Sequence, residues 1–228
     1  MHALILADGD APTRAELDGA WPTWDEGVGL VVAADGGARH AKDLRVRIDR
    51  WVGDGDSITD VSRQTLQQDG VAMERAPTDK DESDTELAVL AALAAGADRL
   101  TIVGALGGLR LDHGLANVAM LALPALVGVD VRIVAGTTRI RLLSRTDPGG
   151  SSVGCDLLGR VGDLVSLLPL GGDVVGVTTA GLLYPLTDET LRFARTRGLS
   201  NVRVASTARV TVQSGRLLVV EAPATLWP

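Results

Sequence analysis

The stretch WVGDGDSITD, residues 51–60, ends a short apolar run and then places Asp54 and Asp56 on either side of one glycine. The apolar run belongs to a predicted strand over 47–54. In an extended segment, side chains two residues apart share a face, so the two carboxylates would point the same way. Two like charges held so close together need something to neutralise them.

Strand-like and helix-like segments alternate on both sides of this stretch, over roughly the first 135 residues. Helices are expected over 81–95 and 112–123. Strands that alternate with helices predict parallel pairing and an α/β layered fold. The expected strands cover 3–7, 29–35, 47–54, 71–76, 99–105 and 129–135.

The remainder of the chain contains short strand-like runs separated by glycine-rich turns and shows no convincing long helix. This pattern is typical of a small all-β sandwich. We therefore expect two domains: an open, mostly parallel α/β sheet flanked by helices at 1–136, and a β-sandwich at 137–228 in which DPGGSS (147–152) is a loop. The expected strands cover 139–143, 161–168, 173–178, 202–205, 209–213 and 216–220.

The composition narrows the class of protein. The formal charge is −7 and the chain has two lysines, Lys42 and Lys80, which argues against binding to nucleic acid or to an anionic membrane surface. Cys155 is the only cysteine, so an intrachain disulfide is impossible and a reducing compartment is indicated. The start of the chain has no basic region followed by a long apolar one. A soluble, cytoplasmic protein is expected.

Acidic residues follow several of the predicted strands. Ligands of open α/β sheets bind at the carboxyl ends of the strands, so these acids are expected to gather at one edge of the sheet. On a helix beginning near residue 81, Asp81 and Asp84 would share a face. The acids concerned are Asp35 after the second strand, Asp54 and Asp56 after the third, Asp79, Asp81 and Asp84 before the long helix, and Asp112 after the fifth strand.

Carboxylates crowded into one cleft repel each other, and a divalent cation relieves the repulsion. Oxygen ligands without suitably spaced histidine or cysteine favour Mg²⁺ over Zn²⁺, and Mg²⁺ commonly shares its coordination between carboxylates and phosphate oxygens. The turns DGGA (35–38) and GALGG (104–108) suit phosphate binding by backbone N–H groups, and Arg110 is a candidate phosphate clamp. Each motif alone also fits a plain turn or a helix cap; their number at one predicted sheet edge favours a metal–polyphosphate site.

Six motifs, taken in order, resemble the thiamine pyrophosphokinase family. The resemblance implies Mg²⁺-dependent transfer of the pyrophosphoryl group of ATP to thiamine, giving AMP and thiamine diphosphate. It also implies a catalytic domain at 1–136, a thiamine-binding domain at 137–228, and a homodimer with active sites at the subunit interface. The motifs are ADGGA (34–38), VGDGDSI (52–58), PTDKDESDTELAV (77–89), GALGGLRLDHGLAN (104–117), SLLPLGGDVVGVTTAGLLYPL (166–186) and GLSN (198–201).

The resemblance also implies roles for individual residues. Leu109 departs from the usual pattern, in which the arginine directly follows the two glycines, so the direction of Arg110 is open. The proton acceptor is also open between Asp84 and Asp56. The implied residues are Asp54, Asp56, Asp81 and Asp84 for catalysis; Asp35, Asp54, Asp56 and Asp84 for the metal; Asp35, Gly36, Gly37, Lys80, Gly107, Gly108, Arg110, Asp112 and His113 for ATP; and Asp84, Ser200 and Asn201 for thiamine.

Three other functions remain as alternatives. The acceptor could be a hydroxymethylpterin-like alcohol, since related folds pyrophosphorylate such compounds. The chain could be a non-catalytic nucleotide or thiamine sensor of the same fold. It could also be a metal-dependent phosphohydrolase, which would release phosphate or pyrophosphate from ATP without any need for thiamine.

Overall fold

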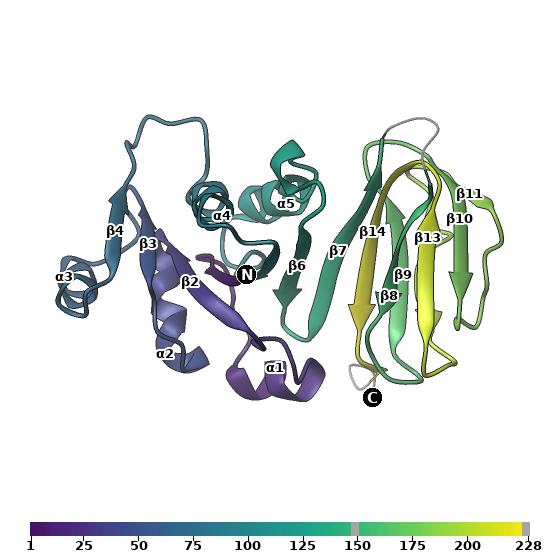
Figure 1. Cartoon of the computed structure of the whole chain (residues 1–228), viewed down its shortest axis with the longest axis horizontal. Helices are drawn as coiled ribbons and strands as arrows, with labels where there is room; N and C mark the ends of the chain where they lie inside the picture. Colours follow the sequence, from purple (N-terminus) through teal and green to yellow (C-terminus); the bar gives the residue numbers. More distant parts are fainter. Residues whose placement is uncertain (147–150, 225–228) are drawn as a thin grey trace. The chain divides into compact units, whose positions relative to one another are not determined.

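The computed structural model describes residues 1–146 and 151–224, in two compact units that divide between Thr137 and Thr138 (Figure 1). Residues 147–150, within the predicted DPGGSS loop, lie outside the described part of the chain. Among the described residues, no helix is both long enough and apolar enough to cross a bilayer.

The first unit is built on six strands in the order β6-β5-β1-β2-β3-β4, and every neighbouring pair is parallel. The predicted α/β fold is therefore confirmed. The chain runs outward from β1 to β4 and then returns to β5 on the other side of β1, which creates a switch in strand order beside β1. The strands are β1 (His2–Leu6), β2 (Val28–Ala34), β3 (Arg50–Gly53), β4 (Ala72–Arg75), β5 (Arg99–Val103) and β6 (Asp130–Ala135).

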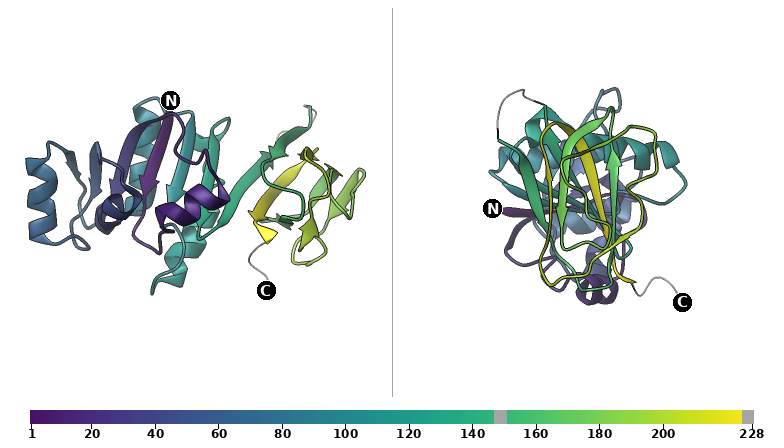
Figure 2. Two further views of the ribbon diagram at one scale, coloured as in Figure 1. Left: turned by 90° about the horizontal axis from the view of Figure 1, so that it is seen from below. Right: turned by 90° about the vertical axis from the view of Figure 1, so that its right-hand side faces the viewer.

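Helices cover both faces of this sheet (Figure 2). On one face, Leu4 and Leu6 of β1 pack with Leu17 and Leu44 from two helices. The alternating residue Ile5 points to the other face and is also fully buried. The helices are α1 (Arg14–Ala20), α2 (Ala41–Leu44), α3 (Asp60–Gln68), α4 (Asp84–Ala94) and α5 (Leu111–Met120), with 3-10 turns η1 (Asp35–His40) and η2 (Pro124–Leu126).

Helix α4 packs against β1, β2 and β3 and begins later than the sequence suggests. Ser83 is its N-cap: the residue is extended, and its hydroxyl accepts a hydrogen bond from the backbone N–H of Glu86 at 3.2 Å. Asp81 therefore precedes the helix, and the expectation that Asp81 and Asp84 share a helix face is wrong. Buried alanines, including Ala88 and Ala92, let the helix approach the sheet closely.

The second unit is a β-sandwich, as predicted. Its sheets have the orders β12-β9-β14-β7 and β11-β10-β13-β8, and their strands pair antiparallel. Leu167 and Leu217 from one sheet and Val177 and Val210 from the other pack in one core. The strands are β7 (Thr138–Arg145), β8 (Val153–Leu157), β9 (Leu164–Pro169), β10 (Val174–Ala180), β11 (Glu189–Leu191), β12 (Asn201–Val202), β13 (Ala208–Val212) and β14 (Gly215–Ala222); the sequence pattern missed β8 and β11.

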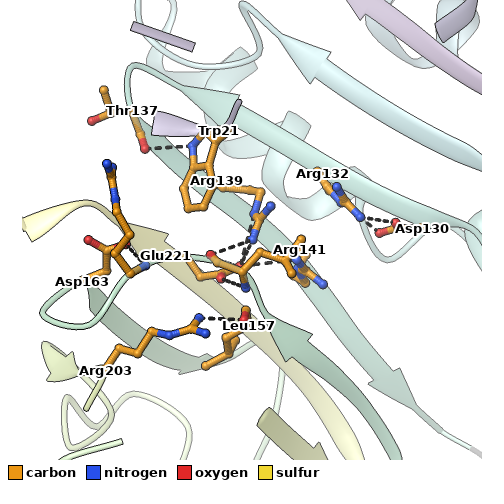
Figure 3. Close-up of polar contacts among 12 residues, drawn as sticks. Trp21, Asp130, Arg132, Thr137, Arg139, Arg141, Leu157, Asp163, Arg203 and Glu221 are labelled. Atoms are coloured by element: carbon orange, nitrogen blue, oxygen red, sulfur yellow. Dashed lines mark hydrogen bonds and ion pairs between the residues drawn. The ribbon is translucent and has the colours of Figure 1, made fainter. Parts of the chain in front are cut away.

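The second unit also contains a buried ionic cluster (Figure 3). Glu221 on β14 accepts a hydrogen bond from the Arg139 guanidinium at 2.8 Å, and the guanidinium of Arg141 lies 3.4 Å away. The second oxygen of Glu221 accepts from the backbone N–H of Leu158 at 2.9 Å. All three charged residues are more than nine-tenths buried, so Glu221 compensates two largely buried cations.

We expect Glu221→Ala to lower the free energy of unfolding of the second unit by about 3–5 kcal/mol, because it leaves two buried arginines without their carboxylate. Glu189→Ala removes an ion pair with Arg197 at a more exposed position and should cost less than about 1 kcal/mol. Urea unfolding followed by circular dichroism compares the two. Equal losses would contradict the importance of the buried cluster.

Candidate active site

A cleft of about 610 Å³ opens in the first unit at the carboxyl ends of its strands. This is where ligands of open α/β sheets bind, beside the switch in strand order. The volume suits a small molecule. The cleft is lined by segments that follow β1, β2, β3 and β5 and by the connection between β4 and α4, with Asp8, Gly9, Asp35, Arg39, Asp54, Asp56, Ser57, Lys80, Asp84, Gly107, Gly108, Arg110, His113 and Asn117 among its residues.

Three carboxylates meet in this cleft. Asp35 follows β2, Asp54 follows β3 and Asp84 opens α4, and each offers an oxygen within 4.8 Å of the others. We call these three residues the carboxylate trio. The sequence thus predicted correctly that acids from separate connections would gather at one sheet edge.

Asp56 also lines the cleft but is exposed and lies outside the trio. Strand β3 ends at Gly53, and Gly55 takes a left-handed conformation with φ +87°. The backbone N–H of Asp56 then donates to a side-chain oxygen of Asp54 at 3.1 Å. The segment therefore turns instead of remaining extended as expected, although the side chains of Asp54 and Asp56 still lie close enough to interact.

Asp35 is held in a strained conformation. Its φ of 40° lies in the left-handed region, which costs a non-glycine residue about 1–3 kcal/mol. The indole N–H of Trp51 donates to the Asp35 carbonyl at 3.0 Å, and the Ser57 backbone N–H donates to Asp35 Oδ2 at 3.1 Å. A Cβ on Gly53 would come within 2.8 Å of the Asp35 Cβ, so glycine is needed there.

The surroundings of the other carboxylate oxygen of Asp35, Oδ1, show whether the site suits a metal ion. Asp35 is only 2% exposed, and among the described residues its Oδ1 has no hydrogen-bond partner. Burial raises the pKa of Asp35 to about 6; the Ser57 N–H opposes this rise, and the nearby acids Asp84 and Asp56 add to it. A buried, unpartnered carboxylate oxygen beside two further carboxylates suits a hard divalent cation such as Mg²⁺.

Lys80 places a positive charge between two members of the trio. Its Nζ lies 3.0 Å from Asp54 Oδ2 and 3.0 Å from Asp84 Oδ1, and its side chain is only 11% exposed. Burial alone would lower the pKa of Lys80, but the hydrogen bonds and charges of the two aspartates raise it. The same hydrogen bond lowers the pKa of Asp54. The ammonium group therefore compensates two members of the trio.

The β5–α5 loop is fixed from two sides. From the first side, Gly9 N–H donates to the Gly104 carbonyl at 2.7 Å, and the Asp10 carboxylate accepts from the Gly108 N–H at 3.0 Å. From the second side, the buried Asn117 amide donates to the Ala105 carbonyl at 2.7 Å. The Gly108 N–H is thus already bonded to Asp10 and is not a free phosphate donor in this state.

Gly36 and Gly37 bring η1 close to β1 and are buried. A Cβ on Gly37 would overlap the carbonyl of Leu6, so only glycine permits this approach. Neither glycine is among the residues found to line the cleft, in contrast to Gly107 and Gly108. A direct role for Gly36 and Gly37 in binding ATP stays a prediction.

The remaining residues predicted to bind ATP lie toward the start of α5. Arg110 and His113 line the cleft. The exposed Arg110 guanidinium bonds both oxygens of Asp112, at 2.9 and 2.7 Å, and these bonds lower the pKa of Asp112 to about 2. Asp112 and the exposed Asp81 are not among the residues that line the described cleft.

Sequence reasoning missed the segment that follows β1. Asp8 lines the cleft and forms an ion pair with Arg39, which also donates to the Gly9 carbonyl at 3.0 Å. An imidazole nitrogen of His40 is 3.0 Å from the same carbonyl. The signal was available, because ADGD (7–10) follows the first predicted strand at the edge where the other acids were expected.

Ser200 and Asn201 lie in the second unit. Asn201 is buried, and its amide exchanges hydrogen bonds with the backbone of Tyr184: the Tyr184 N–H donates to Oδ1 at 3.0 Å and Nδ2 donates to the Tyr184 carbonyl at 2.7 Å. Asn201 thus fixes the backbone of Tyr184, whose side chain is exposed. Ser200 is exposed, with φ 56°. Contact of either residue with thiamine stays a prediction.

We expect Asp35→Asn to raise the melting temperature of the metal-free protein at pH 8. The folded protein binds a proton at Asp35 more tightly than the unfolded chain, so this group's contribution to stability is lost as pH rises from about 4 through 6. The advantage of the variant should therefore shrink as pH falls below 6. Thermal melts in EDTA measure it, with Asp69→Asn as the control; a difference independent of pH would contradict the assignment.

Both units of the chain match families of known proteins. Residues 23–133 match the family described as thiamin pyrophosphokinase, catalytic domain, and residues 154–218 match thiamin pyrophosphokinase, vitamin B1 binding domain. The thiamine pyrophosphokinase of Bacillus subtilis is 27% identical over 168 residues, which are 74% of this chain and 75% of that protein.

Solved structures show the same fold. The thiamine pyrophosphokinase of Bacillus subtilis has a TM-score of 0.81 at 24% identity and covers 98% of this chain and 99% of its own. That of Geobacillus thermodenitrificans has a TM-score of 0.77 at 26% identity over 97% of each chain. That of Candida albicans has a TM-score of 0.77 at 16% identity, over 97% of this chain and 88% of its own. The chain belongs to the thiamin pyrophosphokinase family.

Proposed function

We propose that this protein transfers the pyrophosphoryl group of ATP to the hydroxyl group of thiamine, giving thiamine diphosphate and AMP. One observation carries the proposal. In a chain that matches both domains of the family, one cleft brings together the carboxylate trio, Lys80 and the glycine-rich β5–α5 loop.

Asp35, Asp54 and Asp84 would hold Mg²⁺, as their oxygen donors and the unpartnered Asp35 Oδ1 suggest. Bound there, Mg²⁺ would neutralise negative charge on the phosphates of ATP. Lys80 and Arg110 line the same cleft and would hold phosphate oxygens. The net negative cleft would also attract the permanently cationic thiazolium ring of thiamine.

In the reaction, the hydroxyl oxygen of thiamine forms a bond to the β-phosphorus of ATP. The bond from that phosphorus to the oxygen bridging the α- and β-phosphates breaks, and AMP leaves with the electron pair. Asp56, exposed at the cleft and in no ion pair among the described residues, would accept the hydroxyl proton. Orientation of the two reactants can contribute about 7–11 kcal/mol when it is ideal.

The second unit would supply thiamine contacts through Ser200 and the loop that Asn201 fixes.

We also propose a cytoplasmic homodimer with active sites at its interface. Apolar side chains exposed on the second unit, such as Tyr184 and Phe193, support an interface there. Analytical ultracentrifugation tests the dimer; a monomer at micromolar concentration would contradict it.

Incubation of the protein with ATP, thiamine and Mg²⁺ should produce thiamine diphosphate and AMP in equal amounts, and EDTA should abolish both. Mass spectrometry detects the products. A parallel reaction with hydroxymethylpterin should leave that alcohol unchanged. Phosphate or pyrophosphate release without an acceptor would instead indicate a phosphohydrolase, and binding without any product would indicate a sensor.

Asp54→Asn and Asp84→Asn should each lower kcat by about 10²–10³-fold, because each removes a charged oxygen from the trio. Their melting temperatures should change little, since replacing one carboxylate also reduces repulsion. Asp69→Asn, at the exposed end of α3, serves as the matched control for the loss of one carboxylate. Full activity in both trio variants would remove the trio from the proposed mechanism.

A further inference from the structure

The ammonium group of Lys80 contacts two of the three carboxylates that would hold a divalent cation. Lys80 belongs to the connection between β4 and α4, and its Nζ contacts Asp54 Oδ2 and Asp84 Oδ1, at 3.0 Å each. These two aspartates are also members of the trio. A cation bound by all three members therefore competes with Lys80 for two of them.

The competition is electrostatic. With Lys80 in place the trio and its lysine carry a formal charge of −2, and without it the charge would be −3. A divalent cation and an ammonium group only a few ångströms apart repel strongly in a partly buried site. Binding of the metal therefore requires the ammonium group to leave, and a buried ammonium group needs a new anion.

The phosphates of a nucleotide can be that new anion. Lys80 lines the same cleft as the glycine-rich loop, so the ammonium group can leave the carboxylates without leaving the cleft. A metal ion that arrives alone offers Lys80 no such partner. A metal ion that arrives with a polyphosphate takes over the carboxylates, and the phosphates give the ammonium group a new anionic partner.

We propose that Lys80 is an internal counter-ion that excludes free divalent cations from the trio. When a cation arrives with a polyphosphate, the Lys80 ammonium group moves from the carboxylates to a phosphate and the cation binds the trio. The proposal rests on the proposed function and adds a binding preference to it: the site binds the metal–nucleotide complex more tightly than the free metal. Lys80 is thus a positioning residue for the metal as well as a contact for phosphate.

The chain offers matched variants for the test. Lys80→Met removes the charge and keeps an unbranched apolar stem, whereas Lys80→Arg keeps the charge. Lys42, the other lysine, is exposed on α2 and is not among the residues that line the described cleft, so Lys42→Met controls for the loss of a positive charge elsewhere.

Mn²⁺ alone is the first probe, and its free concentration is followed by electron paramagnetic resonance. We expect Lys80→Met to bind Mn²⁺ at least about tenfold more tightly than the wild type, while Lys80→Arg and Lys42→Met bind it as weakly as the wild type does. Mn²⁺ should also raise the melting temperature of Lys80→Met more than that of the wild type. This second readout shows that the variant is folded.

A non-hydrolysable ATP analogue is then added with Mn²⁺. The wild type should now bind Mn²⁺ tightly, and Lys80→Met should bind the analogue more weakly than the wild type. If Lys80→Met gains no affinity for free Mn²⁺ while the wild type binds the metal with the analogue, the counter-ion role is wrong and the proposed function stands. If the wild type binds no Mn²⁺ under either condition, both are wrong.

Discussion

The site depends on the repulsion between three carboxylates held within 4.8 Å of one another. At an effective dielectric constant of about 20, two unit charges at such distances repel by roughly 3–4 kcal/mol. The ammonium group of Lys80 relieves part of this repulsion through Asp54 and Asp84. The pKa of Asp35 is raised mainly by burial, and the nearby charges of Asp84 and Asp56 raise it further.

The fold brings the three carboxylates together and also holds them in place despite their repulsion. Parallel strands bring the ends of β2 and β3 and the start of α4 to one edge of the sheet. Trp51, buried beneath the site, holds the strained backbone of Asp35, and Gly53 leaves space for it. The unfavourable charges therefore lie beside the buried core of the first unit, to which Trp51 belongs. A site prepared in this way exchanges one cation for another with little movement of the sheet.

The sequence predicted most of the fold and the edge of the sheet that carries the site. Alternating strand and helix patterns, followed by short strands, were sufficient for the two architectures. Local geometry was harder: the left-handed Gly55 turns the segment that carries Asp54 and Asp56, and the cap at Ser83 leaves Asp81 outside α4. Both depend on backbone angles that residue spacing alone does not determine.

Contacts between distant segments could not be derived from the sequence. The bond from the Gly108 N–H to Asp10 joins residues 98 apart, and the bond from Lys80 to Asp54 joins residues 26 apart. Motif spacing marks such residues as candidates without showing which of them meet. The family resemblance placed Lys80 near the nucleotide, whereas only the three-dimensional structure shows it between two members of the trio.

Crystals grown with Mn²⁺ and a non-hydrolysable ATP analogue offer the most direct measurement of the central claim. We expect an anomalous difference peak coordinated by oxygens of Asp35, Asp54 and Asp84, with the Lys80 ammonium group moved onto a phosphate oxygen. A peak elsewhere, or Lys80 still bonded to Asp54 and Asp84 beside a bound nucleotide, would contradict it.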